Sequence, residues 1–402
     1  MARDVAVVTP WYPSTQLPFR GAFVRAMVGA TAPVVSRSTV YHCDPWVARL
    51  TPAQDAEIGA ALRELAPYAA GPSRTVGGAA LVTVPVPMPR ALPFAEQGSR
   101  AADALRVALG GRPIDAPVVH AHVGLLGGLP ALRNMREDAR FFVTEHASFL
   151  DRMLAEPDGY AAYAEMLVRC EAFFVVSDLM RNLLAEAFPE HTGKLRLIAN
   201  PIDFATPRPA PVTDLHRWLF VGGLSRSKGV DWLLEAFAIC HRQDPALSLT
   251  LVGEGELRSK LDARVAELGV ADAVTLTGAL APELALDLMR EHDLLVHPSR
   301  SETFGVVVVE ALAGGMPVLV TRCGGPEQTL AGIESAAGEL IAVEDGTDEI
   351  VAGYRRLCDR FPADVDLALA RRTLDERYGY QAVARLHEAA WFDGAGQPSR
   401  GR

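Results

Sequence analysis

Two glutamates separated by eight positions carry the sharpest chemical signal in this sequence of 402 residues. Glu302 stands at the entrance to an apolar stretch, and Glu310 lies inside it. Eight residues of α-helix make a little over two turns, so the two carboxylates would lie about 80° apart around one helix and could address one ligand. A carboxylate in an apolar helix needs a partner. We expect Glu310 to bind a ligand hydroxyl, backbone amides or an arginine, with a buried structural ion pair as the alternative.

A glycine turn followed by two cations is the second signal. In the segment FVGGLSRSKG, a strand ends at Gly222 and Gly223, Arg226 and Lys228 follow, and a helix then begins. Backbone amides at glycines and at a helix N-terminus favour an anion, and the two cations add to this preference. The segment predicts a clamp for a diphosphate, with a plain turn carrying solvated basic residues as the alternative. It matches neither GxxxxGK[ST] nor GxGxxG, which disfavours a P-loop enzyme and a nicotinamide dehydrogenase.

The elements that must position these residues alternate between short apolar strands and helices. In the first half, strands are expected at the following ranges, with helices at 160–170 and 179–187 between them: 5–8, 116–120, 140–144, 172–176 and 195–198. After a proline-rich linker at 206–212 the same alternation restarts and runs to residue 321. This pattern is typical of α/β domains with doubly wound parallel sheets. Two such domains with a cleft between them are the prediction. In open sheets of this kind ligands bind at the carboxyl ends of the strands.

The predicted domain limits are 1–205, 206–375 and 376–402, the last being a C-terminal helix that returns toward the first domain and ends in a tail. The region 43–115 looks less regular. Within it, residues 85–93 (PVPMPRALP) are expected to form an extended loop, because steps into proline disfavour helix.

Composition excludes several classes of function. A net charge of −10 disfavours a dedicated nucleic-acid partner. Five cysteines, never paired as CxxC, indicate neither a disulfide framework nor a zinc cluster, and a reducing cytoplasm is the simplest location. The most apolar stretch, 305–320, is interrupted by Glu310 and is shorter than a membrane span, so at most peripheral membrane contact is expected. The oligomeric state is left open.

The order of these motifs resembles a known family. VGGLSRSKG, LVGEGELR, VTLTGAL, LLVHPSRSETFG and CGGPEQ follow one another, and SxSExFGx4EALAxGxPV resembles the E-x7-E signature of retaining glycosyltransferases of family 4. The resemblance covers roughly residues 5–380 and is strongest over 218–330. It implies the GT-B fold, in which two Rossmann-like domains face a central cleft. It also implies transfer of a sugar from a nucleotide diphosphate sugar, UDP or GDP sugar in particular, to an acceptor hydroxyl or other nucleophile without a metal or other cofactor.

Roles follow from the resemblance by position. Glu310 would hold the ribose hydroxyls of the donor, Glu302 would lie beside the sugar ring, and Lys228 would neutralise the departing diphosphate. The remaining donor-binding residues would be Gly21, Gly222, Gly223, Gly253, Gly278, Leu280, Thr303, Phe304 and Gly305. Gly223 departs from the family, which usually has arginine there, and Arg226 is the expected substitute.

The first half contributes further candidates. His146, in Thr144-Glu-His, is expected to contact the donor sugar, with a packed loop histidine as the alternative. The acceptor is unidentified (a small molecule, glycan or lipid-linked glycan), and its candidate contacts are Pro13, Arg20, His120 and His122. The two last histidines share one face of a strand, so a metal pair is conceivable, but a structural role at the strand end is favoured. Asn200 and Pro201 would position a hinge, and Asp364 and Asp366 are expected to be a solvated pair.

Three other functions are alternatives to transfer. An epimerase of the same architecture would release nucleotide without an acceptor. A phosphorylase would need a phosphorylated cofactor bound to a lysine that the sequence does not identify. A nucleotide-sugar-binding protein without catalysis is the third, and the presence of Glu302, Glu310 and Lys228 argues against it.

Overall fold

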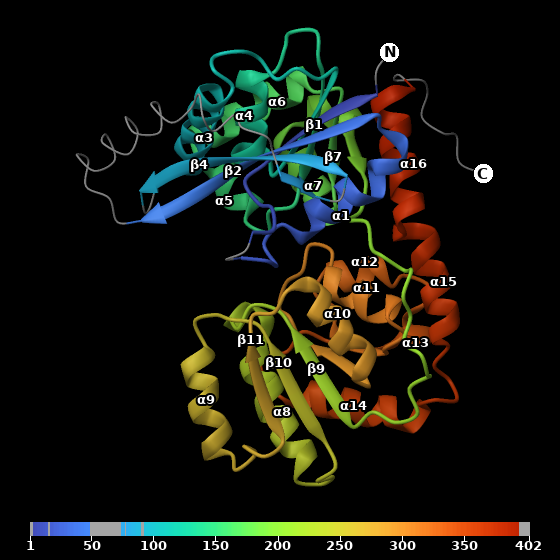
Figure 1. Cartoon of the computed structure of the whole chain (residues 1–402). Coiled ribbons are helices and arrows are strands. Elements are labelled where there is room, and N and C mark those ends of the chain that lie inside the picture. The colour runs from blue at the N-terminus through green and yellow to red at the C-terminus, as the bar shows by residue number, and fades with distance from the viewer. Residues whose placement is uncertain (1–2, 15–16, 49–73, 77, 90–91, 394–402) are drawn as a thin grey trace. The chain divides into compact units, whose positions relative to one another are not determined.

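The computed structural model describes residues 3–14, 17–48, 74–76, 78–89 and 92–393. These fall into two compact units, which are coloured along the chain in Figure 1. Unit 1 takes the described residues within 1–13, 20–199 and 383–402, and unit 2 takes those within 14–19 and 200–382. The main boundary between the two units therefore falls at Ala199/Asn200, whereas the sequence predicts it at 205/206.

Unit 1 is built on a mainly parallel sheet. Its described strands lie in the order β3-β4-β2-β1-β5-β6-β7-β8, and only β3 runs antiparallel to its neighbour. The strands are β1 (Asp4–Thr9), β2 (Arg37–Ala48), β3 (Arg74–Val76), β4 (Ala79–Pro89), β5 (Val118–His122), β6 (Arg140–Glu145), β7 (Ala172–Val175) and β8 (Leu195–Leu197). From β1 the chain adds β2, β3 and β4 on one side of the sheet, and it then adds β5, β6, β7 and β8 on the other side. The strand order thus reverses between β1 and β5, which is where such sheets bind ligands.

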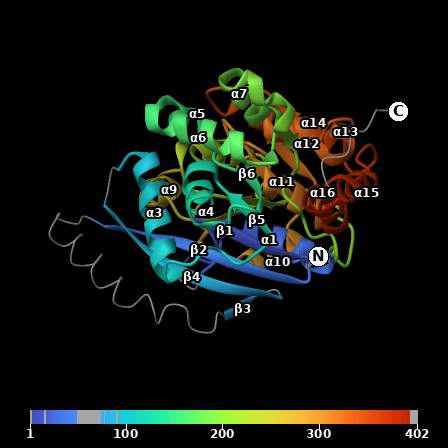
Figure 2. The ribbon, with the colours of Figure 1, turned by 90° about the horizontal axis from the view of Figure 1, so that it is seen from above.

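Helices cover this sheet, and the last of them comes from the C-terminal end of the described chain. They are α1 (Ala22–Thr31), α3 (Phe94–Ala108), α4 (Leu129–Asn134), α5 (Leu150–Ala155), α6 (Pro157–Arg169), α7 (Asp178–Ala187) and α16 (Tyr380–Phe392). The hydroxyl of Ser177 accepts a hydrogen bond from the Met180 amide and caps α7. Helix α3 packs against β2 and β4 (Figure 2). Trp391 of α16 is buried among the apolar residues of β1, β5 and β7.

Residues 85–89 belong to a strand, so the loop expected over 85–93 is wrong for this part, while residues 92–93 are not in a strand. Strand β4 pairs in parallel with β2 from Thr39↔Ala80 to Ala48↔Pro89. Prolines 85, 87 and 89 stand at alternate positions, and successive amides of a strand point to opposite sides. The prolines therefore remove donors from one side only, and the pairing with β2 uses the other. The expected irregularity of 43–115 is likewise wrong for β2, β4 and α3, whereas residues 49–73, 77 and 90–91 lie outside the described chain.

Unit 2 is a fully parallel sheet in the order β11-β10-β9-β12-β13-β14. Its strands are β9 (Arg217–Val221), β10 (Ser248–Val252), β11 (Val274–Gly278), β12 (Leu294–His297), β13 (Val318–Thr321) and β14 (Gly338–Ile341). Counted from β9, this order is 3-2-1-4-5-6, the order of dinucleotide-binding sheets. Its reversal point lies between β9 and β12. The strands predicted over 218–321 are confirmed to within two residues at their ends.

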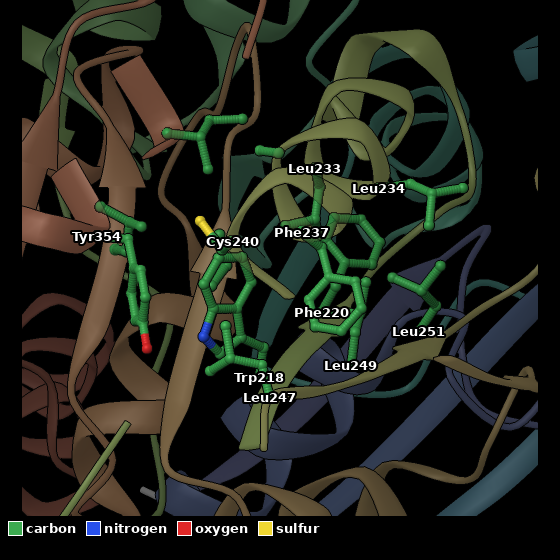
Figure 3. Close-up of a cluster of buried hydrophobic side chains, with 14 of the residues drawn as sticks. Trp218, Phe220, Leu233, Leu234, Phe237, Cys240, Leu247, Leu249, Leu251 and Tyr354 are labelled. Atoms are coloured by element: carbon green, nitrogen blue, oxygen red, sulfur yellow. The ribbon is translucent and has the colours of Figure 1, made fainter. Parts of the chain in front are cut away.

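The core of unit 2 lies between β9, β10, α8 and α14. The helices of the unit are α8 (Val230–His241), α9 (Arg258–Glu267), α10 (Pro282–Glu291), α11 (Val306–Ala313), α12 (Gly325–Thr329), α13 (Glu334–Ala337), α14 (Asp348–Arg360) and α15 (Leu367–Tyr378). The Trp218 ring contacts Phe237 and Tyr354 at centroid distances of 5.6 and 4.7 Å (Figure 3). Its indole N–H donates to the carbonyl of Leu215, so burial leaves no polar atom of this ring unpaired.

Within the described part of the chain, none of the helices combines the length and the apolar character needed to cross a bilayer. Asp364 and Asp366 are exposed, as expected, and the Asp366 carboxylate also caps α15 by accepting from the Leu369 amide.

Candidate active site

The loops that follow β9 and β12 meet at the reversal point of the unit 2 sheet. The hydroxyl of Ser299 and the amide of Arg300 both donate to the carbonyl of Ser227, at 3.2 and 2.8 Å. Gly229 closes the first loop with a φ of +67°, and a Cβ there would lie 2.1 Å from the carbonyl oxygen of Pro298. Only glycine fits this approach. The two loops that carry Lys228 and Glu302 are therefore locked together by backbone contacts.

The Glu302 carboxylate is held by two donors on the same oxygen. Lys228 Nζ lies 2.6 Å and His297 Nε2 lies 2.8 Å from Glu302 Oε1. Burial alone would raise the pKa of Glu302, but the hydrogen bonds and charges of His297 and Lys228 outweigh it and lower the pKa to about 2. Glu302 is therefore ionised at neutral pH, and its negative charge is shared with the lysine.

His297 is a site residue to which the sequence analysis gave no role. It ends β12, is 1% exposed, and stacks on Phe220 with ring centroids 5.3 Å apart. Its Nδ1 is buried and finds no hydrogen-bond partner among the described residues. The sequence carried one hint, a histidine that closes an apolar strand immediately before the Glu302 loop.

Glu302 does not lie on the helix that carries Glu310. Helix α11 begins at Val306, after Gly305 turns the chain with a φ of +79°. The helical spacing that was expected to relate the two carboxylates is therefore wrong, because residues 302–305 are not helical. Glu302 lies in the connection from β12 to α11, and Glu310 lies within α11 itself. Whether they address one ligand stays a prediction.

The Glu310 carboxylate has no hydrogen bond or ion pair to any described residue. Burial raises its pKa to about 7. The expected alternative of a structural ion pair is therefore wrong within the described chain, and so are backbone amides or an arginine as its partner. Of the partners expected for Glu310, a ligand hydroxyl is the one that remains.

Backbone amides before α11 are also unpaired. The N–H groups of Thr303, Phe304 and Gly305 meet no acceptor among the described residues. Successive free amides ending in a left-handed residue form an anion-binding concavity, here at the N-terminus of α11. The Phe304 ring itself is turned into unit 2, where it packs edge-on against Tyr378. Phe304 and Gly305 therefore offer an anion only their amides, whereas Thr303 also has a hydroxyl.

The glycine turns of the neighbouring strands lie beside this region. The amide of Gly222 donates to Val252, and the amide of Gly253 donates to Gly278, at 3.0 and 2.9 Å. A Cβ on Gly253 would lie 1.9 Å from the carbonyl oxygen of Gly222. The structure thus joins three predicted donor-binding glycines and places Leu280 two residues after the last. The bonded amides of Gly222 and Gly253 serve the fold and are not free for a phosphate.

Glycine at position 223, where the family usually has arginine, leaves open space around its Cα atom. Gly223 is exposed, and the nearest atom to a Cβ built there would be the Glu254 carbonyl oxygen at 4.0 Å. Arg226 in the same loop is also exposed and has no ion pair with any described residue. Both positions can therefore present a side chain to a ligand.

In unit 1, Gly21 caps α1 with a φ of +70°, and a Cβ there would lie 2.2 Å from the carbonyl oxygen of Trp11. This contact brings the start of α1 against the loop that follows β1. Pro13 and Arg20, which precede Gly21, are both partly exposed. Burial lowers the pKa of Arg20, and the charge of Asp44 opposes this effect.

The three predicted histidines lie together, but at different depths. His120 and His122 are 0% and 1% exposed, and the centroids of their tilted rings lie 4.4 Å apart, which confirms that they share one face of β5. His122 Nδ1 lies 2.8 Å from His146 Nε2, and the partly exposed His146 ring packs on Phe23. Burial lowers the pKa of both His120 and His122 well below the ordinary value. Their placement favours the structural role over contact with an acceptor.

The described residues include no group of three or more histidine, cysteine, aspartate or glutamate side chains arranged to hold a metal ion.

Comparisons with known proteins agree with this geometry. A family model described as "Glycosyl transferases group 1" matches residues 216–360, and one described as "Glycosyltransferase Family 4" matches 47–206. A glycogen synthase of Mycobacterium tuberculosis is 28% identical over 278 residues, covering 66% of each chain. A D-inositol 3-phosphate glycosyltransferase of Nocardiopsis dassonvillei is 28% identical over 285 residues, covering 63% of this chain and 65% of that one. The chain thus spans about two thirds of the length of these two curated relatives.

Solved structures show the same fold. A sucrose-phosphate synthase from Thermosynechococcus elongatus superposes with a TM-score of 0.72 at 18% identity, covering 97% of this chain and 98% of that one. HepE of Anabaena, solved with UDP and glucose, has a TM-score of 0.66 at 15% identity, covering 96% and 98%. One family model matches the region of the unit 1 sheet, and the other matches the region of the unit 2 sheet. The chain therefore belongs to the family 4-type glycosyltransferases of the GT-B fold.

Proposed function

We propose that this chain is a retaining glycosyltransferase that moves a sugar from a nucleotide diphosphate sugar, a UDP or GDP sugar, to an acceptor hydroxyl or other nucleophile. The acceptor would belong to glycan, glycolipid or natural-product biosynthesis. The observation that carries the proposal is the unpartnered Glu310 carboxylate at the binding edge of unit 2, on the helix whose preceding amides are free. A diol and a diphosphate, joined in one molecule, satisfy both.

Donor binding follows from the chemistry of these groups. Glu310 accepts hydrogen bonds from the ribose hydroxyls, which favours its ionised form and compensates for its burial. The amides of Thr303, Phe304 and Gly305 bind the diphosphate, and Lys228 and Arg226 neutralise its charge. These cations and the N-terminal end of α11 supply the positive charge, so the proposal requires no metal.

Transfer breaks the bond between the anomeric carbon and the diphosphate oxygen and forms a bond from the same carbon to the acceptor oxygen on the same face. The proton of the acceptor hydroxyl passes to the departing diphosphate. Positive charge develops on the sugar ring, and the diphosphate and the ionised Glu302 beside it are the anions that stabilise that charge. Lys228 stabilises the negative charge on the leaving group. His146 is the further residue proposed to contact the sugar.

Calorimetric titration with UDP, GDP, ADP, dTDP and NAD, in the absence of metal, tests this proposal directly. One nucleoside diphosphate should bind clearly more tightly than the others, and the matching sugar nucleotides then identify the donor. Glu310→Ala should weaken this binding, with Glu310→Gln as the control that keeps the size of the side chain. Binding of none of them, or of NAD alone, contradicts the proposal. A cytoplasmic location is part of the same proposal, because that compartment supplies nucleotide sugars.

A further inference from the structure

Glu145, the last residue of β6, is a buried carboxylate to which the proposed chemistry gives no role. It is 0% exposed. Four donors surround it: the amides of Gly124, His146 and Ala147 and the hydroxyl of Tyr163. Burial raises the pKa of Glu145, and these four hydrogen bonds oppose that effect. So complete a set of donors is what a carboxylate needs to remain in the interior of a protein.

The two oxygens of this carboxylate serve different loops. Oε1 accepts from the amides of His146 and Ala147, both at 2.9 Å, in the loop that follows β6. Oε2 accepts from the amide of Gly124, at 3.0 Å, which begins the short π-helical connection after β5 (Gly124–Gly128), and from Tyr163 of α6. Glu145 thus ties together two neighbouring strand-end loops, and one of them carries His146.

The loop after β5 has little freedom to adopt another shape. Val123 has a φ of +67°, which is unusual and costly for a β-branched residue, and its amide donates to the carbonyl of Thr144. At Gly124, a Cβ would lie 2.5 Å from the Tyr163 ring and 2.6 Å from Glu145 Oε2. Strain of this kind persists only where the surroundings enforce it. Here the enforcing contacts are those to Glu145 and Tyr163.

We propose that Glu145 is a positioning residue for sugar transfer, which fixes the backbone of His146 and the turn at Val123–Gly124 in one arrangement. The inference rests on the proposed function, because His146 matters only if it meets the donor sugar. Glu145 has no free oxygen of its own for substrate. It acts through His146, whose ring is held separately by His122.

Glu145→Gln is the sharpest variant. Glutamine keeps the shape, but it has one acceptor oxygen and one NH₂ group in place of two acceptor oxygens. Whichever way the amide turns, its NH₂ faces two donors, either those of the β6 loop or those of the Gly124 side. One of the two loops must therefore shift. A displacement of about 1 Å can cost about 10²-fold in rate, so we expect kcat to fall by that order while the affinity of unit 2 for the nucleoside diphosphate is unchanged.

Two further variants separate positioning from loss of stability. Tyr163→Phe removes one of the four donors and leaves the three amide bonds, so it should fold and should lower kcat less than Glu145→Gln. Asn134→Ala is the matched control, because it removes two buried hydrogen bonds, to Ala102 and Pro130, in the same unit without touching either loop. It should lower the melting temperature and leave kcat near that of the wild type.

The closing experiment combines a double-mutant cycle with an NMR measurement. On a His146→Ala background, Glu145→Gln should cause no further loss of kcat, because its effect passes through His146. In ¹⁵N-histidine-labelled protein, Glu145→Gln should shift the ring signals of His146, and Asn134→Ala should not. Additive losses, an unchanged kcat in folded Glu145→Gln, or unmoved His146 signals each overturn the inference. A wild-type protein that transfers no sugar from any donor overturns the proposed function, and the NMR shifts then still decide whether Glu145 positions His146.

Discussion

The ammonium of Lys228 and the carboxylate of Glu302 lie 2.6 Å apart, although they come from loops 74 residues apart in the chain. The cation proposed to neutralise the leaving group is thus already paired before a donor arrives. The Glu302 side chain is 12% exposed and that of Lys228 29%, so salt screens this pair less than an ion pair at the surface. A bound diphosphate would offer Lys228 a second anionic partner beside the first.

Removal of this cation should affect the transfer step more than binding. Lys228→Ala removes a charge that faces the leaving group, where developing negative charge is greatest, so we expect kcat to fall by about 10²–10³-fold. The dissociation constant of the nucleoside diphosphate should rise much less, because the amides before α11 remain. Steady-state kinetics together with calorimetry measure the two effects. A weaker affinity with an unchanged kcat would show that Lys228 only binds.

Donor binding should release a proton near neutral pH. Burial raises the pKa of Glu310 to about 7 from an ordinary value of 4.5, so at pH 7 about half of the free protein carries a proton on this carboxylate. Ribose hydroxyls that donate to the carboxylate favour its ionised form, so binding lowers the pKa and expels that proton. Affinity should accordingly rise with pH between about 6 and 8.

Calorimetry in two buffers of different ionisation enthalpy counts the released protons. Glu310→Gln should abolish the release and flatten the pH dependence of affinity, because the amide does not titrate. If the variant releases as many protons as the wild type, Glu310 is not the titrating group.

Gly223 and Arg226 should be able to exchange roles. If Arg226 substitutes for the family arginine, Arg226→Ala loses a charged hydrogen bond to the diphosphate, and affinity should fall by about tenfold. Gly223→Arg has room for its side chain, since the nearest atom to a Cβ there lies 4.0 Å away. The double variant should recover most of the lost affinity. An affinity that is unchanged in Arg226→Ala would remove this residue from the donor site.

Acid should destabilise unit 1 through its buried histidines. Burial lowers the pKa of His120 and His122, and it lowers the pKa of His387 to about 4. The unfolded chain therefore binds more protons than the folded one below the ordinary value of 6.5, and stability falls as the pH drops from 6.5 toward 4. Urea unfolding at pH 7 and at pH 5 measures the loss. His387→Gln should make the loss smaller, and an unchanged difference would contradict this account.

The parts of the fold that could be predicted are those encoded locally. Strands such as β6 and β12 are short apolar runs bounded by polar residues, and a buried parallel strand requires that pattern. Glu302 and Glu310 could be predicted as site residues because the first stands at the entrance to one of the most apolar segments of the chain and the second interrupts it. By contrast, β4 was missed because repeated prolines exclude helix but leave open whether an extended segment pairs with another strand.

The contacts that define the candidate site could not be predicted from the sequence. His297 lies five residues before Glu302, but its hydrogen bond depends on how the chain turns between them. Glu145 meets Gly124 and Tyr163 only because β5, β6 and α6 pack together. Neither His297 nor Glu145 belongs to a sequence motif with a recognisable spacing. Both are polar groups at strand ends, and the sequence alone does not say which of these are buried.

The alternate prolines of β4 also bear on how this protein behaves in a crowded solution. Strand β3 covers β4 only at Ala79–Leu81, and beyond that pairing the side of β4 turned away from β2 meets no strand among the described residues. Along Pro85, Pro87 and Pro89 that side offers carbonyl acceptors but no N–H donors. A strand from another molecule could form at most half of the backbone hydrogen bonds of a regular strand pair along this edge. Along this part of β4, which no described strand covers, the prolines thus disfavour edge-to-edge self-association and aggregation.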